Sequence, residues 1–133
     1  MVQAINDLRT LGVGVFMDDF GAGYSSLGVL ADLPISGIKC DRLFVRQLPQ
    51  DPRRQSLLRH VVRLARDLQL EVVVEGVETE QELQSVLESG IGNVQGYFFS
   101  KAMPPEAVPQ WHQAYRPAQI NLLPPRPTAA PGP

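Results

Sequence analysis

Short apolar runs recur along most of the chain, and glycine or acidic residues bound them. They are Val13–Met17, Ile35–Cys40, Val72–Val74 and Val94–Phe99. Continuous apolar runs of this length are typical of parallel strands, which are buried on both faces of a sheet. We therefore predict four β-strands at these positions.

Helical patterns lie before and between these runs, with apolar residues three or four positions apart and polar residues on the other face. Thr79 followed by Glu82 matches a capping box, Ser25 or Ser26 is placed to cap a helix, and Gly12 and Gly90 stand where helices would end. The pattern predicts four helices that alternate with the strands. Their apolar positions are Val2, Ile5 and Leu8; Leu27 and Leu30; Leu57, Leu58, Val61, Val62, Ala65 and Leu68; and Leu83, Val86 and Leu87.

Alternation of helix and strand indicates parallel strands that are joined by right-handed crossovers. Such a fold is either a doubly wound sheet or a piece of a (β/α)8 barrel. A complete barrel takes about 250 residues, whereas this chain has 133. We therefore predict an α/β fold with parallel strands, and as a barrel only a partial one.

A change in composition near Arg116 divides the chain. Six of its twelve prolines fall in residues 117–133, and a segment so rich in proline lacks the backbone donors and the periodicity of a packed element. We predict one domain over residues 1–116 and a disordered, proline-rich tail over residues 117–133. The chain as a whole, with 44% hydrophobic and 20% charged residues, has the composition of a globular protein.

Charge and cysteine content exclude several classes of partner. A formal net charge of -2 provides no basic stripe for a nucleic-acid polymer. The single cysteine, Cys40, cannot form an internal disulfide, and no apolar stretch is long enough for a membrane segment. We expect a cytoplasmic location, no binding to a nucleic-acid polymer and no membrane segment in this chain.

Polar residues stand at the predicted carboxyl ends of the strands. Asp18 and Asp19 follow the first strand, Lys39 the second and Glu75 the third, with Glu78 three residues later, while Gln95 lies in the fourth. Because these ends meet at one edge of a parallel sheet, we expect the side chains to lie close together. Both aspartates can reach one site only if the strand ends there and the backbone turns, and the glycines of Phe20–Gly23 favour such a turn.

A cluster of carboxylates favours Mg2+ or Mn2+ over zinc. Two such cations about 3.5–4 Å apart promote phosphate-ester hydrolysis, and Lys39 would add positive charge where negative charge develops. Each residue also has a simpler interpretation: the aspartates as a cap or turn, Glu75 and Glu78 as solvated residues at a helix start, and Lys39 as an exposed charge. The set as a whole favours a metal-assisted phosphoesterase.

Other polar residues give no sign of ligand binding. Cys40 is interpreted as a small buried hydrophobe. His112 lies beside the tail, and His60 lies in a helix whose basic face is typical of a solvated surface, with docking of an acidic partner as the less favoured alternative. The arginines of that helix are Arg53, Arg54, Arg59, Arg63 and Arg66.

The segment Asp18–Leu27, which reads DDFGAGYSSL, resembles the signature loop of the EAL family of cyclic di-GMP phosphodiesterases. Further family blocks follow in family order. They are Leu33–Ile35, Ile38–Arg42 with Phe44 and Val45, Val74–Thr79 and Gln95–Lys101. The resemblance covers about residues 1–108 and implies the last four β/α units of a TIM-type barrel.

The resemblance implies a role for each strand-end residue in the hydrolysis of cyclic di-GMP to linear pGpG. Asp18 and Asp19 would bind two cations, Mg2+ or Mn2+, and Glu75 would reach them as ligand or general base. Lys39 would orient the attacking water and the scissile phosphate, and Gln95 would hydrogen-bond in the same region. Glu78 would anchor the glycine loop.

The chain lacks the Glu-Ala-Leu motif that names the family, and it lacks the Asn and the Glu that complete the first metal's ligands. With three ligands missing, we expect weak metal binding and little or no phosphodiesterase activity from the isolated chain. One alternative is a non-catalytic binding or dimerisation module, and a less favoured one is an unrelated phosphate-handling α/β protein. Because an open parallel sheet leaves two unpaired edges, we also expect self-association or pairing with an EAL or GGDEF partner in bacterial signalling.

Overall fold

A computed structural model describes residues 1–23 and 27–115 of the chain, and these fall into two units that divide between Ala102 and Met103. The second unit contains a short 3-10 helix, η3 (Pro105–Ala107), and α5 (Val108–Ala114), where the rings of Trp111 and Tyr115 lie 5.0 Å apart. The first unit contains all the strands. Its elements are α1 (Val2–Thr10), β1 (Phe16–Phe20), α2 (Leu27–Asp32), β2 (Gly37–Cys40), the 3-10 helices η1 (Arg42–Phe44) and η2 (Leu48–Gln50), α3 (Pro52–Asp67), β3 (Glu71–Val74), α4 (Glu80–Glu88) and β4 (Asn93–Val94).

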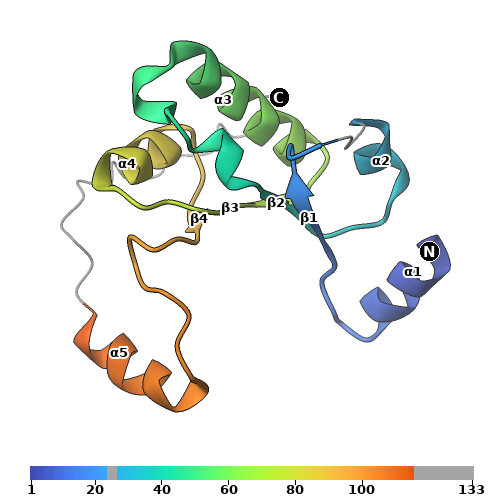
Figure 1. The fold of residues 1–133 in the computed structure, drawn as a ribbon. Helices are drawn as coiled ribbons and strands as arrows, with labels where there is room; N and C mark the ends of the chain where they lie inside the picture. Colours follow the sequence, from blue (N-terminus) through green and yellow to red (C-terminus); the bar gives the residue numbers. More distant parts are fainter. Residues whose placement is uncertain (24–26, 116–133) are drawn as a thin grey trace, which may run out of the picture. The chain divides into compact units, whose positions relative to one another are not determined.

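The four strands form one parallel sheet in the order β1-β2-β3-β4 (Figure 1). Each strand pairs with the next along the chain, and a helix lies between every two strands in sequence. Strands β1 and β4 are therefore the edges of the sheet. The α/β class and the parallel strands that the sequence predicts are confirmed.

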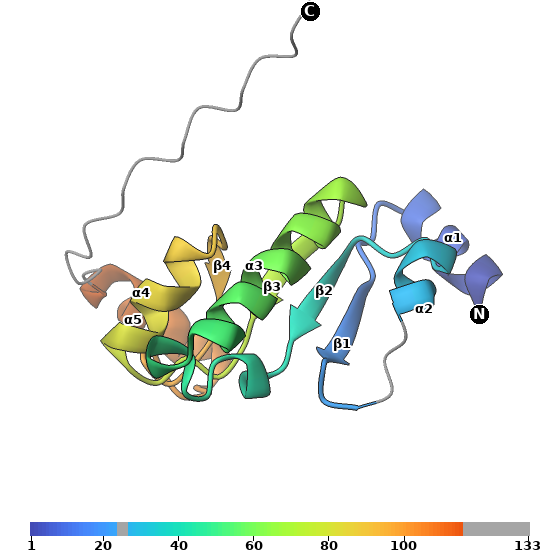
Figure 2. The ribbon, with the colours of Figure 1, turned by 90° about the horizontal axis from the view of Figure 1, so that it is seen from above.

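Helices α3 and α4 cover one face of the sheet (Figures 1 and 2). That face presents Ile38, Cys40 and Val74, which are fully buried. The helices contribute buried apolar side chains at the spacing that the sequence pattern predicts, which include Leu58, Val62, Ala65, Leu83 and Val86. Burial of such side chains stabilises the fold by about 1.5–3 kcal/mol each before entropy is counted, so this layer is the core of the unit.

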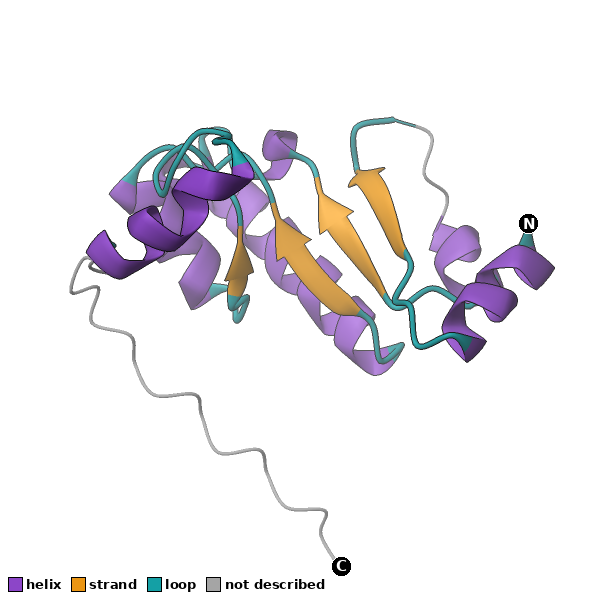
Figure 3. Cartoon of the chain, turned by 90° about the horizontal axis from the view of Figure 1, so that it is seen from below, coloured by secondary structure: helices purple, strands orange, loops and turns teal. Residues whose placement is uncertain are grey.

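The opposite face of the sheet carries the polar strand residues. Phe16 pairs with Gly37, and Lys39 pairs with Val73. Gly37 and Lys39 are two positions apart on β2, and side chains alternate along a strand, so these four positions share one face. Figure 3 shows the four strands pointing the same way, so their carboxyl ends lie along one edge. Phe16, Lys39 and Val73 are only half-buried, in contrast to the core side.

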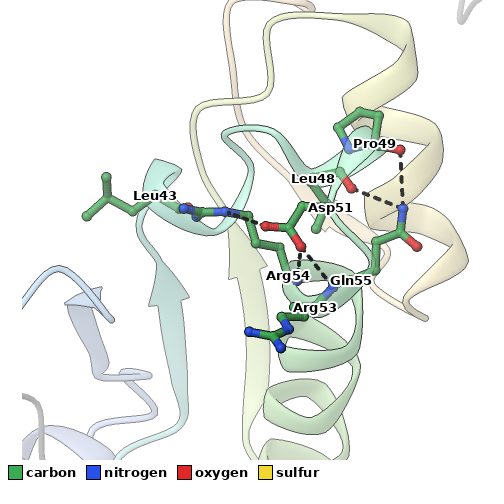
Figure 4. A network of polar contacts seen from close by, with 7 residues as sticks. All are labelled: Leu43, Leu48, Pro49, Asp51, Arg53, Arg54 and Gln55. Carbon is green, nitrogen blue, oxygen red and sulfur yellow. Dashed lines mark hydrogen bonds and ion pairs between the residues drawn. The ribbon is translucent and has the colours of Figure 1, made fainter.

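A network of polar contacts fixes the segment between β2 and α3 (Figure 4). Asp51 caps α3 by accepting from the backbone N–H groups of Arg53 and Arg54, at 2.9 and 3.3 Å. The guanidinium of Arg54 donates to the carbonyl of Leu43 at 2.8 Å, and its Nε lies 3.4 Å from the Asp51 carboxylate. Gln55 donates to the carbonyl of Leu48 at 3.0 Å. The network holds η1 and η2 against the start of α3 and so positions the chain that leaves the end of β2.

Strands β2 and β3 lie within two residues of the predicted bounds, and the other two strands differ more. Strand β1 covers Phe16–Phe20 rather than Val13–Met17, because pairing with β2 begins at Phe16 and resumes at Phe20 after the acidic pair. Strand β4 ends at Val94 rather than at Phe99, because Gly96 lets the chain turn and the Phe98 N–H bonds to the carbonyl of Val77 at 3.0 Å. The apolar residues of this predicted strand instead pack in a turn, where the rings of Phe98 and Phe99 meet edge to face.

The predicted helices are confirmed, and so is the capping box of Thr79 and Glu82. Helix α5 was not predicted, and the possible caps Ser25 and Ser26 and the tail over 117–133 lie outside the described residues. The division of the chain at residue 116 stays a prediction. Of the helices within residues 1–23 and 27–115, none is long and apolar enough to cross a membrane.

Candidate functional site

The carboxyl ends of the strands are tied together by a series of backbone hydrogen bonds. In each, the first residue after one strand donates to the last residue of the strand before it. Asp41 donates to Phe20 at 3.2 Å, Glu75 to Cys40 at 3.0 Å and Gln95 to Val74 at 2.8 Å. The residues that follow β2, β3 and β4 therefore stand in a row along one edge of the sheet.

A bulge in β1 brings both aspartates to this edge. The pairing of β1 with β2 shifts register between Met17 and Phe20, and Asp19 adopts a left-handed backbone with φ of 51°. The N–H of Asp19 donates to the Asp18 carboxylate at 3.0 Å. The sequence indicates a backbone turn at this pair, and the turn takes place inside the strand rather than after it.

Asp18, Asp19 and Glu75 form a carboxylate cluster, in which one oxygen of each residue lies within 4.8 Å of the others. The donors are all hard oxygens, which suit Mg2+, Mn2+ or Ca2+ and not the nitrogen and sulfur sites typical of zinc. The positively charged ammonium of Lys39 forms ion pairs with two members of the cluster. These residues therefore fit a divalent cation.

Lys39 stands on β2 between the acidic residues of β1 and β3. Its Nζ pairs with Glu75 and lies 3.4 Å from Asp18. The hydrogen bond to Glu75 is the main cause that raises the pKa of Lys39 above its ordinary value, and the contact with Asp18 acts in the same direction against the partial burial of the amine. The ammonium is therefore charged at neutral pH and lies within the cluster.

A cleft of about 580 Å³ begins at Glu75 and follows the ends of β2, β3 and β4. Two predicted site residues, Glu78 and Gln95, line it together with Glu75. No hydrogen bond or ion pair links the Glu78 carboxylate to Gly21–Gly23, the described part of the glycine loop, so its role as a loop anchor stays a prediction. The remaining lining residues are Asp41, Arg42, Gly76, Gly96, Tyr97, Ser100, Lys101 and Ala102.

Sequence reasoning did not single out Arg42, Tyr97 or Lys101 as site residues. Arg42 stands two positions after the end of β2 and Tyr97 three positions after the end of β4. Functional residues in parallel α/β folds also lie in the loops that follow the strands. The position of Arg42 just after β2 could therefore have indicated a place in the site. The predicted strand Val94–Phe99 included Tyr97, so the prediction did not place this residue in a loop that lines the cleft.

Cys40 and the basic helix lie apart from this chemistry. Cys40 is fully buried, as predicted, and burial together with the nearby charge of Glu75 raises the pKa of its thiol to about 12. His60 is exposed and shares a hydrogen bond of 2.7 Å with the carbonyl of Ser56 within α3. Of the helix arginines, Arg53, Arg59, Arg63 and Arg66 are exposed. These residues have the structural surroundings that the sequence indicates.

Comparison with known proteins places these features in a family. Residues 1–102 match the family model described as EAL domain. The cyclic di-GMP phosphodiesterase PdeR of Escherichia coli (strain K12) is 43% identical over 114 residues, which are 86% of this chain and 17% of the relative. The chain thus spans about a sixth of that curated relative.

Solved structures give the same result for the fold. The EAL domain of Mycobacterium smegmatis DcpA matches with a TM-score of 0.80 and 36% identity, over 87% of this chain and 52% of that one. The PaMucR phosphodiesterase in a complex with c-di-GMP matches with a TM-score of 0.72 and 38% identity, over 80% of this chain and 43% of that one. The four strands therefore correspond to part of an EAL barrel.

Proposed function

Because the chain belongs to the EAL domain family, we propose that its strand-end residues form part of a two-metal site that hydrolyses cyclic di-GMP to linear pGpG. The carboxylate cluster of Asp18, Asp19 and Glu75 carries this proposal. Asp18 and Asp19 lie on β1 and Glu75 directly follows β3, with β2 between these strands, and their oxygens converge to within 4.8 Å. Nothing in helix capping or surface solvation requires that convergence.

Asp18 and Asp19 are the proposed ligands of Mg2+ or Mn2+, and Glu75 is the proposed third ligand or general base. Divalent cations at this cluster would neutralise charge on the phosphate and make water more acidic. The bulge in β1 supports the assignment, because it turns two successive carboxylates toward one region. A left-handed backbone at a non-glycine residue costs about 1–3 kcal/mol, and such strain is typical of functional sites.

Lys39 and Gln95 are the proposed partners of the scissile phosphate and of the attacking water. Lys39 keeps its charge beside the cluster and is itself only half-buried, so its ammonium can stabilise negative charge that develops on phosphate oxygens. Gln95 stands next to Glu75 along the strand ends and lines the same cleft. Its amide can donate and accept at once, which suits a residue that orients water.

The chain corresponds to about half of a solved EAL domain, so we propose that the activity needs groups from the rest of that domain. Loss of a single group that only orients a metal ligand already costs about 10–100-fold in affinity or activity, and loss of the ligands themselves should cost more. The isolated chain is expected to bind metal weakly and to hydrolyse cyclic di-GMP slowly or not at all.

The test is a chimera in which this chain replaces the matching half of the Mycobacterium smegmatis EAL domain. We expect the chimera to hydrolyse cyclic di-GMP with Mg2+ or Mn2+, and Asp18→Asn or Glu75→Gln to reduce kcat at least about 100-fold. Glu71→Gln is the matched control, because Glu71 is exposed at the opposite end of β3. A folded chimera without activity would overturn the proposed function, whereas equal turnover by the isolated chain would overturn the claim that other groups are needed.

The open edges of the sheet lead to the proposal that the chain associates with itself or with another EAL or GGDEF protein. Strands β1 and β4 each have one unpaired side within the described sheet, and folded proteins cover or pair such edges. Light scattering on the purified chain is the test, and a stable, compact monomer would contradict self-association. The proposed compartment is the cytoplasm, which suits a chain whose single cysteine is free and buried.

A further inference from the structure

The backbone of Asp19 is held in a conformation that residues other than glycine seldom adopt. Its φ is 51°, and a left-handed residue of this kind persists only where the surrounding structure over-determines it. Two local hydrogen bonds contribute: the N–H of Asp19 donates to the Asp18 carboxylate at 3.0 Å, and the N–H of Ala22 donates to the Asp19 carbonyl at 3.1 Å. Both lie among exposed residues, where water competes for such bonds. The turn therefore needs support from elsewhere in the fold.

The ring of Phe44 gives this support from the segment that follows β2. It stacks on the ring of Phe20, with centroids 6.3 Å apart and planes 4° from parallel, an arrangement that aromatic pairs favour. It also lies against Gly21, because a Cβ atom added at Gly21, whose φ is 93°, would overlap the Phe44 ring. Phe20 and Gly21 are the two residues that directly follow Asp19. One ring therefore holds both residues that continue from the left-handed position.

Phe44 is itself fixed by backbone bonds and by the start of α3. Its N–H donates to the carbonyl of Asp41 at 3.0 Å, and the N–H of Asp41 donates to the carbonyl of Phe20 at 3.2 Å. The neighbouring carbonyl of Leu43 accepts from Arg54 of α3 at 2.8 Å (Figure 4). The contact between Phe44 and the turn is thus tied to a regular helix, and side chains held by such elements are placed more precisely than those held by loops alone.

We propose that Phe44 is a positioning residue for the carboxylate cluster: it keeps the backbone of Asp19 left-handed and so directs the Asp19 carboxylate toward Asp18 and Glu75. This inference rests on the proposed function for the role of the cluster in binding metal. Without the ring the turn would relax, and Asp19 would return to extended backbone. Successive side chains of an extended strand point to opposite faces, so the two aspartates would no longer reach one site.

The experiment is NMR on the full 15N-labelled chain, first in EDTA and then with Mn2+. In EDTA, the coupling between the amide and α protons of Asp19 reports φ, which differs between left-handed and extended backbone. Phe44→Ala should move this coupling away from its left-handed value. It should also raise about tenfold the Mn2+ concentration that broadens the amide signals of Asp18, Asp19 and Glu75, as expected for loss of an orienting group. Phe44→Leu, which keeps a branched apolar side chain, should restore most of the affinity.

Two further variants separate positioning from a general loss of stability. Phe98→Ala is the matched control, because it removes another half-buried ring, whose aromatic contact is with Phe99 after β4. It should lower the urea midpoint and leave the Asp19 coupling and the Mn2+ titration unchanged. Gly21→Ala should lower the folding equilibrium constant at least about fivefold more in the unmodified chain than in Phe44→Ala, because only the former keeps the ring that the new Cβ atom would overlap.

The outcomes distinguish this proposal from the proposed function. An unchanged Asp19 coupling in a folded Phe44→Ala variant, or equal costs of Gly21→Ala in the two backgrounds, would overturn the role of Phe44. A changed coupling with an unchanged Mn2+ titration would overturn the claim that this backbone conformation serves metal binding. Absence of any broadening in the unmodified chain would contradict the proposed metal site, whereas the coupling measured in EDTA would still decide whether Phe44 holds Asp19.

Discussion

Replacement of Lys39 by methionine tests the electrostatics of the carboxylate cluster, because it removes the ammonium and keeps an unbranched apolar stem. Lys39 pairs with Glu75 and with Asp18, and the side chains of the three residues are 29%, 20% and 64% exposed respectively. Exposed ion pairs contribute up to about 1 kcal/mol each, and the value falls as exposure increases. The better-buried pair with Glu75 should account for most of the effect. We expect Lys39→Met to lower the free energy of unfolding by about 1–2 kcal/mol in the absence of metal.

The assay is urea denaturation of the full chain, with and without Mn2+. Lys39→Met leaves three converging carboxylates without their cation, so Mn2+ should stabilise the variant more than it stabilises the unmodified chain, through preferential binding to the folded state. Lys101→Met is the matched control, because Lys101 is the only other lysine in the chain and contacts the ring of Tyr97 rather than an acidic group. It should unfold within about 0.5 kcal/mol of the unmodified chain.

The sign of the pH dependence follows from the raised pKa of Lys39. A lysine whose pKa is higher in the folded state stabilises that state at pH values below its ordinary pKa of 10.5, and this stability is lost only as the pH rises through the folded value. The difference between Lys39→Met and the unmodified chain should therefore stay constant from about pH 7 to 9. Equal urea midpoints for the two proteins, or a larger effect of Mn2+ on the unmodified chain, would refute the electrostatic reasoning.

Three further substitutions or reactions test the parts of the fold that position the site. Thr79→Ala removes the capping hydrogen bond to the N–H of Glu82 and should cost about 1 kcal/mol in urea denaturation, and an unchanged midpoint would contradict the capping role. Gly96→Ala forces a Cβ atom against the backbone of Val77 and should cost about 1–3 kcal/mol, whereas Gly92→Ala, where nothing lies within 4 Å, should cost at most about 1 kcal/mol and serves as its control. The Cys40 thiol, with its pKa raised to about 12 and its side chain fully buried, should react with a thiol reagent only after denaturation, and rapid reaction in the native chain would show that this strand opens.

The sequence predicts those site residues whose positions depend only on the direction of the strands. Once four parallel strands are recognised, their carboxyl ends must meet at one edge, and Asp18, Lys39 and Glu75 follow from their positions in the sequence. The ion pairs of Lys39 with both acidic residues agree with that reasoning. Local apolar patterns were sufficient here because strand order equals sequence order.

The rest of the site depends on contacts between segments that are distant in sequence. The bulge at Asp19 is a property of the pairing between β1 and β2, and an apolar run in the sequence does not show where an extra residue interrupts that pairing. The early end of β4 results from the close approach of Gly96 to Val77, which an apolar run such as Tyr97–Phe99 conceals. Both errors concern backbone geometry, and both lie at positions that shape the site.

Glu75 is the residue that joins the two parts of the site, because it belongs to the carboxylate cluster and also begins the cleft. A change at Glu75 should therefore alter both the proposed metal site and the cleft, and it cannot distinguish the role of one from the role of the other. Asp18 belongs only to the cluster, and Tyr97 lines only the cleft. If the two sites act on one substrate, Asp18→Asn and Tyr97→Ala should each lower turnover in the chimera, and their combined effect should be smaller than the product of the two if they hold the same bound molecule. Independent, multiplicative effects would mean that the cleft and the cluster do not hold one substrate molecule in a productive complex.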